Sequence, residues 1–306
     1  MRALLLAGPT ASGKSALALQ LAEASGAAIV NADAMQVYRE LRILTARPSP
    51  ADEARVPHRL FGFVPASERF SAGRYAAAAA GALEALAAQG RLAIITGGTG
   101  LYFEAITRGL SPLPPIPAPV RAAAEALLAA IGPEALHARL AARDAETAAT
   151  LRPVDGQRVV RAWEVLEATG TPLVAWQRQT GTPLIPAEVP RIVLRPGRAW
   201  LDHRIATRVE AMLATGARAE VEALRAAGLD PRLPALKAIG VREVGAWIDG
   251  EATREQTAAS LVTLTRQYAK RQMTWARGRM ADWLALDPAD PTTPGRLAAL
   301  MPAKEP

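Results

Sequence analysis

Short apolar runs alternate with longer helical stretches in the first third of the chain. Ala3–Ala7, Ala28–Val30 and Leu92–Thr96 are compact apolar runs, and each predicts a short buried strand. Ser15–Ala24 and Ser71–Gln89 carry apolar residues at helical spacing, which predicts helices in the two intervals between these strands. Strands that alternate with helices in this way predict an α/β fold with a parallel sheet.

A proline-rich segment separates this pattern from a purely helical block. Five prolines fall within residues 112–119 and predict a stiff, extended linker. No strand alternation follows, and the spacing predicts helices over Val120–Ile131, Glu134–Arg143 and Gly156–Ala168. Pro183–Pro190 then predicts a return linker. The predicted domains are an α/β core with C-terminal helices over residues 1–111 and 190–306, and an all-helical insertion over residues 112–189.

The C-terminal third rejoins the sheet and then becomes helical. Arg191–Leu194 predicts a strand, and the spacing after it predicts helices over Leu201–Ala214, Ala217–Ala227 and Arg254–Met280. On the first of these helices Arg204 and Arg208 lie one turn apart, so they point either into a cleft together or outward to solvent.

The last helix carries a stripe of positive charge. Arg266, Lys270 and Arg277 share this stripe, with Tyr268 and Trp275 close by. Cations next to aromatic rings fit a track for RNA phosphates with stacking partners, and a solvated helix face explains the same pattern.

The clearest chemical signal is a phosphate loop between the first strand and the first helix. GPTASGKS matches the pattern G-x-x-x-x-G-K-[ST], so backbone N–H groups and a helix N-terminus surround one anionic centre. Lys14 adds a point charge, and Ser15 is the expected ligand of a magnesium ion. The predicted di- or triphosphate site consists of Gly8, Pro9, Thr10, Ala11, Ser12, Gly13, Lys14 and Ser15.

A carboxylate follows the second strand. Ligands of open α/β sheets bind at the carboxyl ends of the strands, so Asp33 is expected to face the bound phosphates. Asp33 is also a suitable N-cap for a helix starting near Met35, and capping would not exclude chemistry. His58, in a loop-to-strand segment, has a structural and a functional interpretation that both stay open.

The third strand ends in a second glycine loop rather than in an acidic residue. ATPases and GTPases ordinarily place a carboxylate there to hold the magnesium shell. Here Thr96 is followed by GGTG, and a helix runs on through Tyr102. This difference favours a loop that holds a leaving group, with Thr99 donating a hydrogen bond to it. The alternative is a tight turn whose glycines adopt positive φ.

Composition narrows the class of protein further. The 306 residues carry a net charge of +7, which is compatible with a polyanionic partner. The chain has no cysteine, so disulfides and thiolate metal sites are excluded. Its three histidines leave few ligands for a zinc site. No apolar segment is long enough to span a membrane, and the phosphate loop begins too early for a signal peptide. We expect a soluble cytoplasmic protein.

Eight motifs in order and spacing give the sequence a family resemblance. They are GPTASGKS, NADAMQVY, PHRL, ITGGTGLY, GLSPLP, DGQRVVRAWEV, KAIGVRE and TRQYAKRQMTW. Together they resemble the tRNA dimethylallyltransferase family, also called tRNA isopentenyltransferases, from Leu4 to about Arg279. The departures are small: Ser15 stands where many relatives have Thr, and Ala34 where Ser is common.

The resemblance implies a fold, a reaction and a partner. The fold would be a P-loop NTPase-like α/β core with a helical insertion domain, and the tRNA anticodon stem-loop would lie between them. The reaction would move a dimethylallyl group from dimethylallyl diphosphate to the exocyclic amine of the adenosine 3′ of the anticodon, position 37. That adenosine would flip out of the stacked loop and the diphosphate would arrive from the other side. The expected assembly is a monomer with Mg²⁺.

The residues and the resemblance agree on the expected site. Attack by an aryl amine needs a base, assigned to Asp33, and stabilisation of the leaving diphosphate, assigned to Lys14, Thr99 and Arg208. The tRNA contacts that the resemblance implies are Asp33, Ala34, Met35, Gln36, Thr99, Arg121, Gln157, Arg158, Val159, Val160, Arg161, Lys237, Ala238, Ile239, Gly240, Val241 and Arg242.

Two other functions remain open at this stage. A small-molecule or nucleotide kinase that binds ATP shares the phosphate loop, but it ordinarily has the acidic strand end that is missing here. A non-enzymatic RNA-binding protein whose loop senses a nucleotide would leave Asp33 and Thr99 without a task.

Overall fold

A six-stranded sheet in which every pairing is parallel organises the core of the protein. The computed structural model describes residues 2–179 and 181–302, so the outermost residues of the predicted core and residue 180 of the predicted insertion lie outside it. The strand order is β3-β2-β4-β1-β5-β6. The strands are β1 (Ala3–Ala7), β2 (Ala28–Asn31), β3 (His58–Arg59), β4 (Ala93–Gly97), β5 (Arg191–Leu194) and β6 (Leu284–Leu286).

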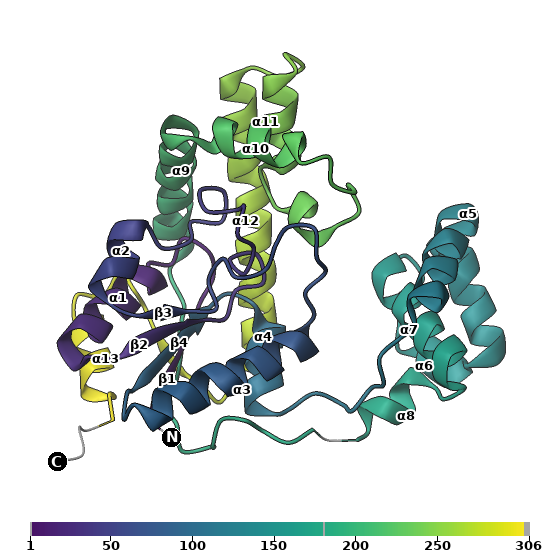
Figure 1. The fold of residues 1–306 in the computed structure, drawn as a ribbon, viewed down its shortest axis with the longest axis horizontal. Helices are drawn as coiled ribbons and strands as arrows, with labels where there is room; N and C mark the ends of the chain where they lie inside the picture. The colour runs from purple at the N-terminus through teal and green to yellow at the C-terminus, as the bar shows by residue number, and fades with distance from the viewer. Residues whose placement is uncertain (1, 180, 303–306) are drawn as a thin grey trace. The chain divides into compact units, whose positions relative to one another are not determined.

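Helices of the core cover both faces of this sheet (Figure 1). They are α1 (Lys14–Ser25), α2 (Pro50–Arg55), α3 (Ala72–Ala88), α4 (Gly100–Thr107), α9 (Arg198–Thr215), α10 (Ala217–Ala226), α11 (Val241–Ile248), α12 (Arg254–Arg279) and α13 (Thr293–Ala299). The predicted α/β fold with a parallel sheet is therefore confirmed. Among the described residues no helix combines the length and apolar character needed to cross a bilayer.

Alternation along β1 supplies both halves of the core. Leu4 and Leu6 belong to an apolar cluster that includes residues of α1 and α13, whereas Leu5 belongs to the larger cluster on the other face. Successive side chains of a strand point to opposite faces, so one short apolar run anchors both helical layers. A strand buried on both faces has to be apolar throughout, as Ala3–Ala7 is.

The middle of the chain forms a second compact unit, residues 108–183, in whose described part every secondary-structure element is a helix. Its helices are α5 (Ala118–Arg143), α6 (Ala145–Ala149), α7 (Gly156–Thr169) and α8 (Leu173–Gln177). Gly132 leaves helical geometry with φ 79° and Pro133 follows it, so α5 consists of the two predicted helices joined at a kink. Leu136, Leu140 and Val159 are completely buried in this unit.

A long C-terminal helix provides the wall above the carboxyl edge of the sheet. α12 packs against α4, α9 and α11 (Figure 1). A capping box fixes its start, because the Thr253 side chain accepts from Gln256 N–H and the Gln256 side chain accepts from Thr253 N–H. Through α12, residues near position 270 reach the loops that follow β1 and β4.

Candidate active site

Three loops leave the same edge of the sheet in hydrogen-bonded register. Gly8 N–H donates to Gly97 O at 3.3 Å, and Ala32 N–H donates to Thr96 O at 2.8 Å. The contact continues beyond the strands, because Thr99 N–H donates to Ala32 O at 3.1 Å. The phosphate loop, the segment around Asp33 and the GGTG loop therefore lie side by side, as expected for a ligand site of an α/β sheet.

Lys14 is a buried cation inside the phosphate loop. Its side chain is 8% exposed, and Nζ donates to Pro9 O at 3.3 Å. Burial lowers the pKa of Lys14 to about 8, with Arg208 acting in the same direction and the negative charge of Asp33 opposing both. An anion bound in the loop would restore the charged form of this lysine.

Ser15 lies in the exposed first turn of α1, where its hydroxyl is free to reach a ligand above the loop. No cluster of three or more His, Asp or Glu that could hold a metal ion occurs within the described residues. Mg²⁺ commonly takes most of its ligands from substrate phosphates and water, so one hydroxyl beside the predicted diphosphate site fits this ion.

Asp33 lies in a turn rather than at the start of a helix. Its Oδ1 accepts from Met35 N–H at 3.0 Å, and its own N–H donates to Asn31 Oδ1 at 2.8 Å. The alternative of an N-cap for a helix near Met35 is therefore wrong, because bends and turns follow there. Two successive side-chain turns of this kind hold the backbone away from helical geometry.

Asp33 lines a cavity of about 270 Å³, here called the Asp33 cavity, together with Thr10 and Arg208. Arg208 Nη1 donates to Thr10 Oγ1 at 2.8 Å, so of the two open orientations the inward one holds for this residue. Burial holds the pKa of the Arg208 guanidinium below its usual range, while Asp33 raises it again. Arg204 stacks on the Trp200 ring at 4.8 Å, and its Nε donates to Ala11 O of the phosphate loop at 3.0 Å.

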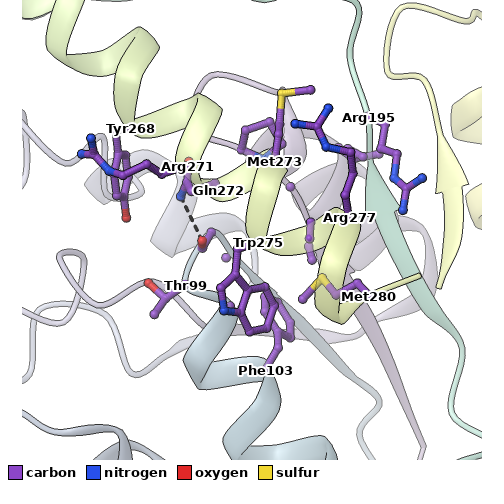
Figure 2. A pocket seen from close by; sticks show the side chains of 18 residues that line it. Thr99, Phe103, Arg195, Tyr268, Arg271, Gln272, Met273, Trp275, Arg277 and Met280 are labelled. Atoms are coloured by element: carbon purple, nitrogen blue, oxygen red, sulfur yellow. Dashed lines mark hydrogen bonds between the residues drawn. The ribbon is translucent and has the colours of Figure 1, made fainter. Parts of the chain in front are cut away.

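A second cavity of about 430 Å³, here called the apolar cavity, lies against Gly8 and Pro9 of the phosphate loop (Figure 2). Phe103 and Trp275 are among its apolar walls. Tyr268 and Arg271 line both cavities, so the two adjoin one another along α12. Burial, with a smaller contribution from Asp33, raises the pKa of the Tyr268 hydroxyl well above its usual range.

Gln272 of α12 connects the two glycine loops. Its Oε1 accepts from Thr10 N–H at 2.8 Å. Its Nε2 donates to Gly98 O at 2.9 Å, the bond that Figure 2 marks with a dashed line. No sequence motif assigned a role to this side chain. Since its partners lie more than 170 residues away, only the folded chain identifies it.

The glycines of GGTG make room for neighbours. A Cβ on Gly97 would lie 2.1 Å from the backbone of Ala32, and one on Gly100 would lie 2.2 Å from the Trp275 ring. Neither of them, nor Gly98, has positive φ. The alternative of a tight turn with positive φ is therefore wrong, and the physical reason for these glycines is close packing.

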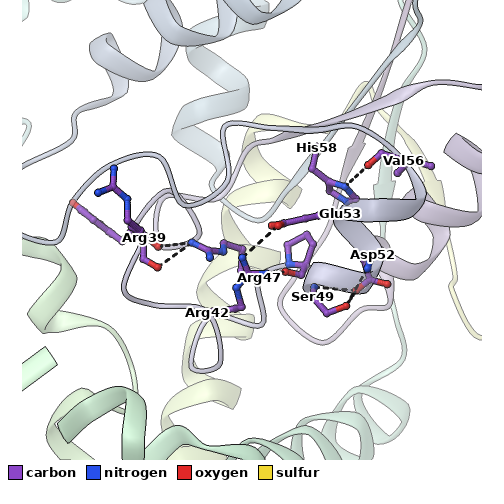
Figure 3. Close-up of polar contacts among 10 residues, drawn as sticks. Arg39, Arg42, Arg47, Ser49, Asp52, Glu53, Val56 and His58 are labelled. Atoms are coloured by element: carbon purple, nitrogen blue, oxygen red, sulfur yellow. Dashed lines mark hydrogen bonds and ion pairs between the residues drawn. The ribbon is translucent and has the colours of Figure 1, made fainter. Parts of the chain in front are cut away.

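The segment between Asp33 and β3 is fixed by contacts with α10 and by its own polar contacts, which Figure 3 shows around Arg42 and Arg47. Glu220 of α10 accepts three consecutive backbone N–H groups, those of residues 42–44, at 2.7, 2.6 and 3.0 Å. Leu44 of this stretch lines the Asp33 cavity. His58 Nδ1 contacts Val56 O at 2.9 Å, a local backbone contact that favours its structural interpretation (Figure 3).

The structure brings together part of the expected tRNA-contact residues. Six of these residues line the Asp33 cavity: Asp33, Ala34, Met35, Lys237, Ala238 and Ile239. Thr99 Oγ1 accepts from Ala34 N–H at 2.8 Å, which ties the GGTG loop to the same place. Gln36 instead donates to Thr45 O and Ala46 O. Gly240 and Val241 are buried, and Arg242 pairs with Glu243 at a separate groove.

The other expected contacts belong to the helical unit. Gln157 and Arg158 are exposed at the start of α7, and Arg161 pairs with Glu164 at 3.2 Å. Arg121 is half-buried on α5. Val159 and Val160 are buried within the unit, so their side chains cannot contact RNA directly, whereas their polar neighbours can.

Binding of pyrophosphate should weaken at alkaline pH because Lys14 loses its proton. With a pKa of about 8 in the free protein, Lys14 must take up a proton when an anion binds near or above that pH. Relative to Lys14→Arg, which stays charged, the wild-type affinity should fall by up to about tenfold per pH unit above about pH 8. Calorimetry in two buffers of different ionisation enthalpy measures the uptake. If pyrophosphate affinity has the same pH dependence in the wild type and in Lys14→Arg, this prediction is wrong.

Gln272→Glu should weaken pyrophosphate binding by about tenfold or more. The carboxylate cannot donate to Gly98 O, and it places a negative charge beside the phosphate loop. Gln267→Glu is the matched control, because it adds the same charge at an exposed position of the same helix. Calorimetric titration with pyrophosphate measures the affinity of both variants. If Gln272→Glu and Gln267→Glu bind pyrophosphate equally well, Gln272 does not contribute to the anion site.

Family models match nearly the whole chain. The IPP transferase family matches residues 36–279, and the isopentenyl transferase family matches residues 1–68. A tRNA dimethylallyltransferase of Rhodopseudomonas palustris is 52% identical over 291 residues, covering 94% of this chain and 91% of that protein. One of Parvibaculum lavamentivorans is 54% identical over 282 residues, covering 92% and 90%.

Solved structures resemble the chain over the same extent. The full-length tRNA isopentenylpyrophosphate transferase from Bacillus halodurans has a TM-score of 0.68 at 30% identity, covering 97% of this chain and 94% of that one. A eukaryotic dimethylallyltransferase acting on tRNA has a TM-score of 0.81 at 25% identity, covering 98% and 78%. These matches confirm the resemblance predicted from the motifs, and the chain belongs to the tRNA dimethylallyltransferase family.

Proposed function

We propose that this protein transfers the dimethylallyl group of dimethylallyl diphosphate to the exocyclic amine of the adenosine 3′ of the anticodon in tRNA. The observation that carries the proposal is the arrangement at the sheet edge. A phosphate loop, the Asp33 carboxylate and Arg208 lie around one cavity, and a second, apolar cavity adjoins it. Relatives named tRNA dimethylallyltransferase support the same reaction.

Asp33 would act as the general base. The adenosine amine is a weak nucleophile, so its attack on the allylic carbon is helped by removal of a proton. The N–C bond forms, the bond between that carbon and the diphosphate oxygen breaks, and the amine proton passes to the Asp33 carboxylate. Oδ1 of this carboxylate is held by Met35 N–H, which fixes its orientation toward the cavity.

The leaving diphosphate would be stabilised by groups already in place. It departs with the bonding electron pair, and its growing charge would face the buried Lys14 and Arg208. Thr99 accepts a hydrogen bond from Ala34 N–H through its oxygen, and its hydroxyl would donate to a leaving oxygen of the diphosphate. Ser15 would hold Mg²⁺, which would supply further charge neutralisation for the diphosphate.

The RNA part of the substrate would be the anticodon stem-loop, with its adenosine flipped into the Asp33 cavity. Lys237 lines that cavity, and Lys270 is an exposed cation on α12. In the helical unit Arg158 pairs with Asp155 at 3.4 Å, but its side chain is 74% exposed, so a phosphate can reach it. The protein would act as a monomer in the cytoplasm, where its tRNA substrate is found.

Asp33→Asn should lower the rate of dimethylallyl transfer by about two to four powers of ten, because the amide cannot accept the proton. Stem-loop affinity should change much less. The assay is transfer of labelled dimethylallyl to an unmodified anticodon stem-loop, with and without EDTA. EDTA is expected to abolish transfer.

ATP consumption with a small-molecule acceptor is the parallel measurement for the kinase alternative. Robust phosphotransfer without prenyl transfer would overturn the proposed function. Near-normal turnover of Asp33→Ala would remove the base assignment alone.

Stem-loop binding should depend steeply on salt, because phosphate contacts release counterions. Arg158→Ala in the helical unit and Lys270→Ala on α12 should each make the log-log slope shallower by about 0.7 to 1. The Michaelis constant for dimethylallyl diphosphate at saturating RNA should stay nearly constant. Fluorescence anisotropy over a salt series measures the slope.

Arg55→Ala is the control for this salt series. Arg55 of α2 is paired with Glu23 of α1 at 2.6 Å and lines neither cavity, so its loss should leave the slope unchanged. Unchanged affinity and slope in both test variants would identify their charges as a solvated surface.

A further inference from the structure

The apolar cavity beside the phosphate loop has no role in the proton-transfer steps above. Its volume of about 430 Å³ is at the small end of the range typical of small-molecule sites. Phe103, Met273 and Met280 contribute apolar walls, and Gly8 and Pro9 close the side toward the phosphate loop (Figure 2). A ligand of this cavity must therefore be small, mostly apolar and next to an anion site.

Positive charge surrounds this apolar space. Arg195, Arg271 and Arg277 line it, and none of them forms an ion pair with a carboxylate within the described residues. Arg195 Nε is buried without a hydrogen-bond partner among the described residues, and Figure 2 labels Arg195 and Arg277 among the side chains that line this cavity. Unneutralised guanidinium groups around an apolar cavity are complementary to an anion that carries an apolar chain.

We propose that the apolar cavity holds the prenyl chain of the diphosphate donor, and that the indole ring of Trp275 limits the length of that chain. The inference rests on the proposed function, since it assigns the part of the donor that the phosphate loop does not hold. Gln272 binds the phosphate loop one turn before Trp275 on α12. One face of this helix thus meets both the polar and the apolar end of the donor.

Trp275 is suited to act as a fixed limit. Its ring lies directly on the first turn of α4, so closely that a Cβ on Gly100 would be 2.2 Å from Cε3. The ring therefore cannot retreat toward α4 to admit a longer chain. Tyr268 and Arg271 extend from this cavity to the Asp33 cavity, which places the reacting end of the chain toward the base.

Competition between two donors tests the limit. Wild-type protein, given equal dimethylallyl and geranyl diphosphate with an anticodon stem-loop, should transfer the five-carbon group preferentially. Trp275→Leu removes the indole ring from the wall of the apolar cavity and should raise the geranyl to dimethylallyl ratio of kcat/KM by about tenfold or more. Mass spectrometry of the RNA measures both products.

Trp247→Leu is the matched control for lost tryptophan packing. Trp247 is a partly buried tryptophan of α11 that lies outside the cavity, with Arg218 stacked on it at 5.2 Å. Its donor ratio should equal that of the wild type even if its thermal stability falls.

Filling the cavity tests the same site in the opposite direction. Ala276 lines it, so Ala276→Leu should weaken binding of dimethylallyl diphosphate by about tenfold while leaving pyrophosphate affinity unchanged. Calorimetry gives this result without turnover. Unchanged affinities in Ala276→Leu, or an unchanged donor ratio in folded Trp275→Leu, would overturn the assignment.

These measurements distinguish a wrong cavity assignment from a wrong proposed function. If wild-type protein prenylates the stem-loop but neither variant changes donor preference or donor affinity, the function holds and the cavity assignment is wrong. If no prenyl group is transferred, the proposed function fails, and the calorimetric comparison of dimethylallyl diphosphate with pyrophosphate still decides the ligand of the cavity.

Discussion

The close approach of two backbones at the carboxyl edge of the sheet is the constraint on which the site depends. Gly97 lies so near Ala32 that any side chain would overlap its carbonyl group. This contact lets the segment that carries Asp33 pair with the GGTG loop, through Thr99 N–H and Ala32 O. A larger residue at position 97 would move Asp33 away from the phosphate loop, because backbone cannot yield as a flexible side chain does.

The buried charged side chains at this edge of the sheet carry more positive than negative charge. Lys14 and Arg208 are two buried cations, and both interact with the single carboxylate of Asp33. Burial lowers the pKa of both cations, so the protein alone does not fully stabilise their charged forms. A bound diphosphate would balance the excess positive charge. Its departure from the allylic carbon would add negative charge where the cations already lie. The same residues thus serve binding and charge stabilisation.

Short patterns of apolar and polar residues predicted the structural elements that depend on neighbouring residues in the sequence. The boundaries of β1 and β5 agree with the predicted strands, because both are short apolar runs. α2 was missed: its six residues bury no side chain and show no periodicity, although a Ser49–Asp52 capping box starts it. The role of Gln272 was missed too, since it depends on how α12 packs against loops far away in sequence. Long-range geometry of this kind leaves no spacing signal.

α12 shows why the remaining part of the site could not be read from charge alone. The sequence singled out its cations, yet Arg266 is paired with Asp202 of α9 at 3.0 Å. The residues that reach the site lie on its other face, where Tyr268 and Gln272 meet the loops. α12 packs through apolar residues such as Leu261, and the two hydrogen bonds of the partly buried Gln272 side chain satisfy its amide within this packing. The same bonds connect the phosphate loop to the GGTG loop. The packing of α12 and the geometry of the site therefore depend on the same side chain.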